Sequence, residues 1–196
     1  MNSICTTSSL TDPKFIKPIA IEYTLNGVQR RWEAVISHDS VSILLYHTEK
    51  KAFVIVKQLR VPVLNANKKD GMMYELCAGI VDKKISLMQI AQEEVLEECG
   101  YDVPLKKVQR VSEFYTSVGI SGAVQTLFYA EIDDTMQVNA GGGLSDEDIE
   151  VITIPLKEAK TFMFDESKKK TPGVMMAFYW WFDKENCNAT IGENSP

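Results

Sequence analysis

The chain has 196 residues, 45% of them hydrophobic, which is enough for one domain with a complete core. Its formal net charge is −6 and it has no block of lysines and arginines, so there is no electrostatic sign of a nucleic-acid partner. No apolar run reaches membrane-spanning length and no signal-peptide pattern is present, which predicts no membrane partner. Four widely spaced cysteines without metal-binding spacing are typical of reduced thiols in a cytoplasmic protein.

The N-terminal part of the chain is rich in β-forming residues. Residues 1–12 are polar and are predicted to be flexible. Residues 13–38 are predicted to form a small antiparallel β domain whose strands meet at Asn26-Gly27, a two-residue hairpin signal. Three further apolar runs predict strands at residues 39–47, 51–60 and 71–81. The last of these strands runs into a loop at Gly79.

The C-terminal part alternates between helices and strands. The predicted elements are a helix over 86–99, strands near 106–115, 124–132 and 149–155, and helices over 156–164 and 171–185. The segment NAGGGLSDED, residues 139–148, predicts a flexible loop, and residues 186–196 a flexible tail. Strands around one central helix, followed by further helices, predict an α+β fold of α/β/α sandwich type for the main domain, residues 39–185.

The helix that contains the stretch EEVLEECGY carries carboxylates on its apolar side. Ser86 and Gln89 fit a capping box, and Gly100 suits the left-handed position that ends a helix. At about 100° per residue, Glu94 and Glu98 fall in the middle of the apolar arc. That arc consists of Leu87, Ile90, Ala91 and Val95.

Two carboxylates on a buried face require a cation. An unpaired buried carboxylate costs several kcal/mol, and like charges one helical turn apart repel each other. Either basic side chains from elsewhere in the chain or a divalent metal ion would supply the positive charge. Glu94, Glu97 and Glu98 lie close enough on the helix to share one ion. The alternative is that another face of the helix is buried and that these glutamates lie in solvent.

The segment from Gly79 to Tyr101 resembles the Nudix box, a glycine followed at fixed spacing by REUxEExGU, where U is a bulky apolar residue. Gly79 lies fifteen residues before Glu94, as in the family pattern. The other matching residues are Val95, Glu97, Glu98, Gly100 and Tyr101. Two positions differ, because Ile85 stands where the pattern has Glu and Glu93 where it has Arg. In the family these two side chains support each other, so their joint replacement leaves no unpaired partner.

Further segments extend the resemblance over residues 15–182. They are HDSVSILLY, FVIVKQLRVPV, YELCAGIVD, FYTSVGISGAVQTLFYAEI and GGGLSDEDIEVITIPLKEA. These segments are similar to the ADP-ribose and nucleotide-sugar pyrophosphatase branch of the family, above all to its UDP-sugar diphosphatase group. The resemblance implies the Nudix fold and hydrolysis of a diphosphate bond. The mismatches in the box leave a second hypothesis, a module that binds a nucleotide sugar with little or no hydrolysis, although the retained glutamates argue against it.

The resemblance also implies the roles of individual residues. The carbonyl of Ala78, beside Gly79, and the carboxylates of Glu94 and Glu98 would hold Mg²⁺, for which Mn²⁺ can substitute. Glu97 would take a second or water-bridged ion. Magnesium keeps some of its water ligands and shares phosphate oxygens, so this site would be complete only with substrate bound.

Three further positions have implied roles in substrate binding and catalysis. Arg60 matches an arginine that contacts the substrate phosphates; taken alone, it would suit a charged strand end at the surface. The general base of this branch comes from the acidic loop, which predicts Glu147 first and Asp146 second, although the loop by itself resembles a solvated turn. Trp32 has the position from which an aromatic residue stacks on the nucleobase, and a core tryptophan is the alternative.

Substrate and assembly are implied in the same way. Val118 stands where ADP-ribose pyrophosphatases usually have a proline, which favours UDP-sugars, UDP-glucose first, with ADP-ribose as a further substrate.

Close relatives form homodimers through their N-terminal strands, so a homodimer through residues 13–38 is expected. His38 and His47 have no metal spacing and no catalytic role is assigned to them. The aromatic residues around Trp180 and Trp181 are predicted to form core or subunit contacts.

Overall fold

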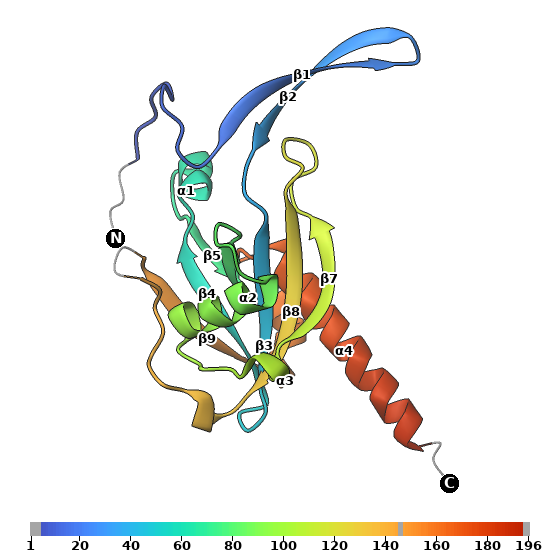
Figure 1. The fold of residues 1–196 in the computed structure, drawn as a ribbon. Helices are drawn as coiled ribbons and strands as arrows, with labels where there is room; N and C mark the ends of the chain where they lie inside the picture. The colour runs from blue at the N-terminus through green and yellow to red at the C-terminus, as the bar shows by residue number, and fades with distance from the viewer. Residues whose placement is uncertain (1–4, 145–146, 194–196) are drawn as a thin grey trace.

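The computed structural model describes residues 5–144 and 147–193 (Figure 1). A seven-stranded mixed sheet lies between two helical layers, which confirms the predicted α+β fold of α/β/α sandwich type. The strands of this sheet are β3 (Ser40–His47), β4 (Ala52–Leu59), β5 (Met72–Glu75), β6 (Cys77–Ile80), β7 (Gln109–Tyr115), β8 (Val124–Ile132) and β9 (Ile149–Pro155). The order is β5-β4-β3-β8-β7, with β6 paired to β3 and β9 paired to β4.

A separate hairpin, β1 (Lys17–Leu25) and β2 (Val28–Ile36), precedes the sheet and projects away from it (Figure 1). Asn26 and Gly27 join the two strands with φ angles of 53° and 76°, the geometry that the predicted two-residue turn requires. The N–H of Val35 donates to the Ile120 carbonyl at 2.7 Å, which ties the base of the hairpin to the loop after β7. The N-terminal antiparallel element is therefore present as predicted.

One helical layer contains the helix with the acidic side chains. α2 (Leu87–Glu94) continues directly into a π-helical turn, η1 (Val95–Cys99), so the last turn is wider than that of an α-helix. Ser86 and Gln89 form the predicted capping box, and Gly100 ends the helix with a φ of 76°. The residues of this helix that are fully buried include Ile90, Ala91 and Val95.

The second layer consists of α3 (Leu156–Phe164) and α4 (Pro172–Glu193), which pack on the other face of the sheet. α4 extends past residue 185, so residues 186–193 are helical, and its C-terminal part projects beyond the sheet (Figure 1). Phe178 and Trp181 stand 4.1 and 5.2 Å from the Phe53 ring, between centroids, so the aromatic cluster belongs to the core. Within the described residues, no helix combines the length and apolarity needed to span a membrane.

The central strands are apolar on both faces because helices cover both faces. In β3, Val41, Ile43 and Leu45 pack on the α2 side, and Leu44 packs on the α4 side. Ser42 lies two residues before Leu44 on the strand, so its side chain points to the same, α4 side. Two single 3₁₀ turns, η2 (Leu105–Lys107) and η3 (Asp134–Met136), lie in the connections before β7 and after β8.

β3 and β4 are paired only near the turn that joins them, through residues 45–47 and 52–54, and then diverge. β6 pairs with the start of β3 and β5 with the end of β4, so the single strand predicted over 71–81 is broken at Leu76. At this break the chain crosses the opening between β3 and β4. A short helix that was not predicted, α1 (Val61–Asn67), connects β4 to β5.

Candidate active site

A cleft of about 480 Å³ lies where β3 and β4 diverge, beside the end of α2. Seven of the nine predicted site residues line it: Arg60, Ala78, Gly79, Glu94, Glu97, Glu98 and Glu147. Other residues of the cleft wall were not predicted, among them Ser40, Gln58, Glu75 and Gln125. The fold thus brings together the end of β4, the β5–β6 break, the acidic helix and the loop before β9.

Glu98 and Glu94 enter the cleft from the helix. Glu98 is only 4% exposed, and its Oε2 accepts a hydrogen bond from the backbone N–H of Ala78 at 3.0 Å. Glu94 lies directly against Gly79, because a Cβ atom at Gly79 would come within 2.0 Å of Glu94 Oε1. Gly79 is therefore needed for the Glu94 carboxylate to occupy this place. These positions contradict the alternative in which the helix turns its glutamates to solvent.

The glycine-rich loop docks on the π-helical turn. The N–H of Gly142 donates to the Glu98 carbonyl at 2.9 Å, and the N–H of Gly143 donates to the Glu97 carbonyl at 3.1 Å. Carbonyl groups at a helix end have no partner within the helix, and the loop satisfies two of them. Gly141 has a φ of +70°, and a Cβ atom there would lie 2.3 Å from the Glu98 carbonyl oxygen. The described part of the predicted flexible loop is therefore anchored to the helix.

This anchored loop brings Glu147 to the cleft. Glu147 Oε2 accepts a hydrogen bond from the N–H of Leu144 at 2.9 Å, which fixes the carboxylate. Its Oε1 has no hydrogen-bond partner among the described residues. The negative charge of Glu147 contributes to the raised pKa values of both Glu94 and Glu98, which places the three carboxylates in one electrostatic cluster. Asp146, the second candidate for the general base, lies outside the described residues.

Arg60 is held by a carboxylate that was not singled out from the sequence. Its Nε and Nη2 donate to Glu75 Oε1 and Oε2, each at 2.7 Å, and this forked contact raises the pKa of Arg60. Glu75 is 7% exposed and immediately precedes the strand break at Leu76. A glutamate within the apolar run GMMYELCAGIV was the available signal for it. The pair fixes the guanidinium in the cleft wall and leaves its Nη1 unused by Glu75.

Four carboxylates of the cleft have no ion-pair partner in the part of the chain that the structure describes. Among the described residues, no ion pair includes Glu94, Glu97, Glu98 or Glu147. Lys83 lines the cleft, but its Nζ pairs with Glu93 at 2.6 Å. A group of carboxylate oxygens short of positive charge is the ligand set of a hard divalent cation such as Mg²⁺.

The pKa values of Glu94 and Glu98 are also consistent with a lack of positive charge near these carboxylates. Burial raises the pKa of Glu98 to about 7; the N–H of Ala78 opposes this shift and the charge of Glu94 adds to it. Burial also raises the pKa of Glu94 to about 7, with repulsion from Glu97 as the next contribution. The ordinary pKa of both groups is 4.5, so the metal-free fold keeps a protonated fraction of each at neutral pH and favours the protonated forms below it.

This protonation predicts a pH-dependent stabilisation by Mg²⁺. Without metal, the folded protein binds more protons than the unfolded chain between pH 4.5 and about 7, so the free energy of unfolding falls as pH rises through this range. A Mg²⁺ ion held by these carboxylates would require their deprotonated forms, so Mg²⁺ should raise the thermal midpoint at pH 8 and hardly at all at pH 5. Thermal unfolding in EDTA and in Mg²⁺ across this range measures the effect. An equal Mg²⁺ shift at both pH values would contradict it.

Trp32 lies apart from the cleft, on the hairpin. The residue is 51% exposed, so the alternative of a core tryptophan is wrong. Its Nε1 donates to the Gly119 carbonyl at 2.9 Å, which ties β2 to the loop between β7 and β8. Within this single chain Trp32 is not part of the cleft wall.

A second group of possible metal ligands lies at the opposite end of β3. His47, Glu49 and Asp134 bring their ligand atoms within 4.8 Å of one another. Asp134 Oδ1 already contacts Lys50 Nζ at 2.9 Å and His47 Nε2 at 3.1 Å. The lysine supplies the positive charge that a metal would bring, and this cluster stabilises the turn between β3 and β4. His47 thus has a structural contact at this turn, far from the cleft.

Comparison with known proteins identifies the family. A search against models of protein families gives no match. Uridine diphosphate glucose pyrophosphatase NUDT14 of Bos taurus is 36% identical over 196 residues, which cover 86% of this chain and 88% of the relative. The chain belongs to the Nudix hydrolase family. The Mus musculus protein of the same name is 35% identical over 198 residues, or 87% of this chain and 89% of the relative.

Other relatives of this Nudix hydrolase include GDP-mannose pyrophosphatases, which match a shorter part of the chain. That of Cronobacter sakazakii is 39% identical over 132 residues, which cover 67% of this chain and 68% of the relative. Together these relatives confirm the predicted enzyme class, a Nudix pyrophosphohydrolase.

In this Nudix hydrolase, the two positions that depart from the family motif are accommodated locally. Ile85 is 38% exposed, in the segment that leads from β6 to α2. Glu93 Oε2 accepts a hydrogen bond from Lys83 Nζ, which ties the same segment to the helix. Glu93 thus has its own partner, and the departure from the motif leaves no unpaired charge at this position.

Proposed function

We propose that this Nudix hydrolase cleaves the diphosphate bond of nucleotide sugars with Mg²⁺, that it prefers UDP-glucose and other UDP-sugars, and that it also accepts ADP-ribose. The observation that carries the proposal is the convergence of Glu94, Glu98, Glu147 and Arg60 on one cleft. The relatives' names, with UDP-glucose and GDP-mannose in them, support the substrate class. The products would be UMP and a sugar 1-phosphate, or AMP and ribose 5-phosphate.

The residues for the metal are those that the motif implies. Glu94, Glu98 and the Ala78 carbonyl would hold Mg²⁺, or Mn²⁺ in its place, and Glu97 would serve a second ion. When bound, such an ion neutralises phosphate oxygens and lowers the pKa of a water ligand. The proposal is supported by the burial of Glu98 and by the absence, among the described residues, of an ion pair to Glu94, Glu97 or Glu98.

The chain's own groups would position the diphosphate and move the proton. Arg60, held in the cleft wall by Glu75, would contact the phosphate oxygens through N–H groups that Glu75 does not use. Glu147 Oε1 would accept the proton of the attacking water, because Oε2 is occupied by the N–H of Leu144. The anchored loop keeps this base beside the acidic helix.

A competition assay tests the substrate order. The purified protein is given Mg²⁺ with equal amounts of UDP-glucose, ADP-ribose and GDP-mannose, and UMP, AMP and GMP are separated and quantified over time. We expect all UDP-glucose to be consumed first, with ADP-ribose next. The initial ratio of products equals the ratio of kcat/KM values. If none of the three is consumed, the proposed function is wrong.

The hairpin supports a homodimer, in which Trp32 would reach the partner's nucleobase site. Side chains of directly paired residues lie on the same face of a hairpin. By this register one face of β1–β2 carries seven apolar residues, together with Lys17, Tyr23 and Arg30; the apolar ones are Ile19, Ile21, Leu25, Val28, Trp32, Ala34 and Ile36. Of these, Ile21, Leu25, Val28, Trp32 and Ile36 are each more than 40% exposed. An isolated two-stranded hairpin is at best marginally stable, so an apolar face of this kind favours a partner.

Analytical ultracentrifugation tests the dimer. The wild-type chain of 22.1 kDa should sediment at twice that mass. Ile21→Asp places a charge on the apolar face and should shift the protein to a monomer, whereas Thr24→Asp, on the opposite face of the same strand, should leave the dimer intact. A monomeric wild type would contradict the proposal.

A cytoplasmic location is also proposed, supported by the four free cysteines.

A further inference from the structure

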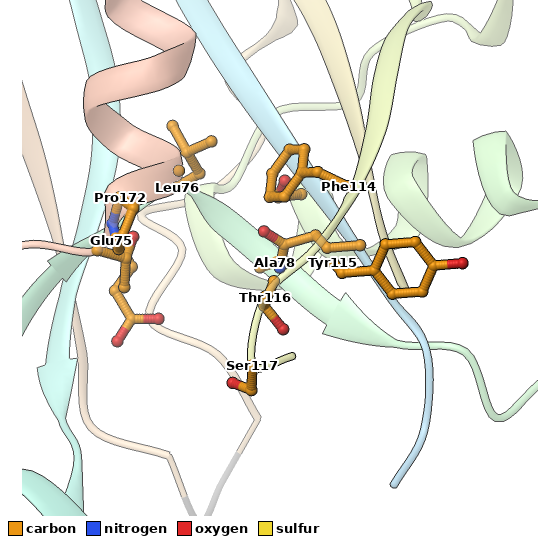
Figure 2. Close-up of a pocket in the computed structure, with 12 residues that line it drawn as sticks. Glu75, Leu76, Ala78, Phe114, Tyr115, Thr116, Ser117 and Pro172 are labelled. Carbon is orange, nitrogen blue, oxygen red and sulfur yellow. The ribbon is translucent and has the colours of Figure 1, made fainter. Parts of the chain in front are cut away.

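A second cavity, of about 380 Å³, adjoins the catalytic cleft. The two share Glu75, Ala78 and Gln125 in their walls, so they adjoin at the β5–β6 break. The second cavity lies toward the α4 side of the sheet, between the end of β7 and the residues Thr171, Pro172 and Gly173 at the start of α4. Figure 2 shows Glu75, Leu76 and Pro172 on one side of it and Phe114, Thr116 and Ser117 on the other.

The floor of this cavity contains a buried hydroxyl group without a partner. Ser42 is 2% exposed, and its Oγ makes no hydrogen bond in the part of the chain that the structure describes. It is the only such side-chain atom found there. Buried polar atoms nearly always have a partner, and an exception at a cavity wall indicates a group that a ligand satisfies. Ser42 is also on the strand face that points away from the acidic helix.

The remaining lining is polar but uncharged. Hydroxyl groups come from Thr116, Ser117 and Thr171, and Gln125 directs its Oε1 toward the start of α4, since its Nε2 donates to Ser40 Oγ at 3.1 Å. Leu76 and Phe114 supply an apolar surface. Tyr115 points away from the other labelled residues (Figure 2).

The lining of the second cavity indicates which part of a nucleotide sugar it would bind. The cavity has no basic residue among its described lining, and its one charged group, Glu75, is already paired with Arg60, so a phosphate is disfavoured. A pyranose ring offers several hydroxyl groups around its rim, each able to donate and accept, and apolar C–H groups on its faces. Dispersed hydroxyl and amide partners beside Leu76 and Phe114 match that pattern.

We propose that this cavity binds the hexosyl group of the nucleotide sugar, with Ser42 Oγ hydrogen-bonded to a sugar hydroxyl. The inference rests on the proposed function, because it places the diphosphate in the adjoining cleft beside Arg60. The shared wall at Glu75 and Ala78 then lies where the second phosphate meets the sugar. Ser42 is a specificity-determining residue in this arrangement, since a buried polar group rejects an analogue that leaves it unpaired.

The test compares UDP-glucose with uridine diphosphate methyl ester, which has the same nucleoside and diphosphate but a methyl group in place of the hexosyl group. Wild-type protein should show a higher kcat/KM for UDP-glucose, and Ser42→Ala should lower the ratio of the two kcat/KM values about tenfold, the worth of one hydrogen bond. Ser112→Ala, which removes a hydroxyl on β7 outside both cavities, should leave the ratio unchanged. Because Ser42→Ala removes an unpaired buried hydroxyl, its thermal midpoint should not fall.

Binding to the metal-free protein separates this inference from the proposed function. In EDTA, calorimetry should show tighter binding of UDP-glucose than of the methyl ester, and Ser42→Ala should abolish the difference. If that pattern is found but neither compound is hydrolysed with Mg²⁺, the hexosyl site stands and the proposed function fails. Equal binding of both compounds by the wild type, or no binding of either, would overturn the inference. So would a Ser42→Ala effect on the choice between UDP-glucose and ADP-glucose, because the base would then occupy the cavity.

Discussion

Replacing Glu98 with glutamine is expected to lower kcat for UDP-glucose hydrolysis about a thousandfold, which corresponds to the several kcal/mol of charge stabilisation that a metal ion supplies. Glu98 is the most deeply buried carboxylate of the cleft, and no cation among the described residues pairs with it. The amide keeps the size of the side chain but removes the negative charge. Glu94→Gln should cause a loss of similar size, because Glu94 faces the same cleft from one turn earlier.

The fold should survive this replacement. The amide oxygen of glutamine can still accept the N–H of Ala78, and one of several mutually repelling charges is removed. The thermal midpoint in EDTA at pH 8 should therefore be equal to or above that of the wild type, and its increase on addition of Mg²⁺ should be smaller. Glu158→Gln, at an exposed position on α3, is the matched control and should retain full activity. Near-normal turnover by Glu98→Gln or Glu94→Gln would refute the metal assignment.

Glu147→Gln is expected to lower kcat about 10²- to 10⁴-fold, the range for removal of a general base. The loop should stay in place, because the amide oxygen can still accept the N–H of Leu144 and the bonds to the helix come from backbone groups. Stabilisation by Mg²⁺ should therefore persist, unlike in Glu98→Gln. This difference separates loss of the base from loss of the metal.

The neighbouring acid provides the comparison for this assignment. Asp146→Asn changes the second candidate, one residue earlier in the same loop, by the same loss of one charge. We expect its kcat to stay within a few-fold of the wild type. A large loss in Asp146→Asn together with near-normal rates in Glu147→Gln would assign the base to Asp146.

Most of the secondary structure follows from local signals in the sequence. The Asn26-Gly27 turn and the Ser86 capping box depend on neighbouring residues only, and both occur as predicted. The inward direction of Glu94 and Glu98 follows from the helical period, because Ile90 and Val95 fix which face is buried.

The features that were missed depend on contacts between distant segments. The role of Glu75 depends on Arg60, fifteen residues earlier, and on the break in strand pairing at Leu76. The π-helical turn and the order of the glycine-rich loop are coupled, since the backbone of each satisfies the other. From its composition alone, that loop is predicted to be flexible. Its three consecutive glycines do not indicate that it binds the end of the helix.

The contact between the glycine-rich loop and the helix is made by main-chain atoms, which has an evolutionary consequence. Gly142 and Gly143 hold the carbonyls of Glu98 and Glu97 whatever side chains follow them in the loop. Side chains elsewhere in the loop can therefore diverge among descendants of this enzyme without loss of these two bonds, apart from Glu147, the proposed base. Gly141, by contrast, leaves no room for a side chain.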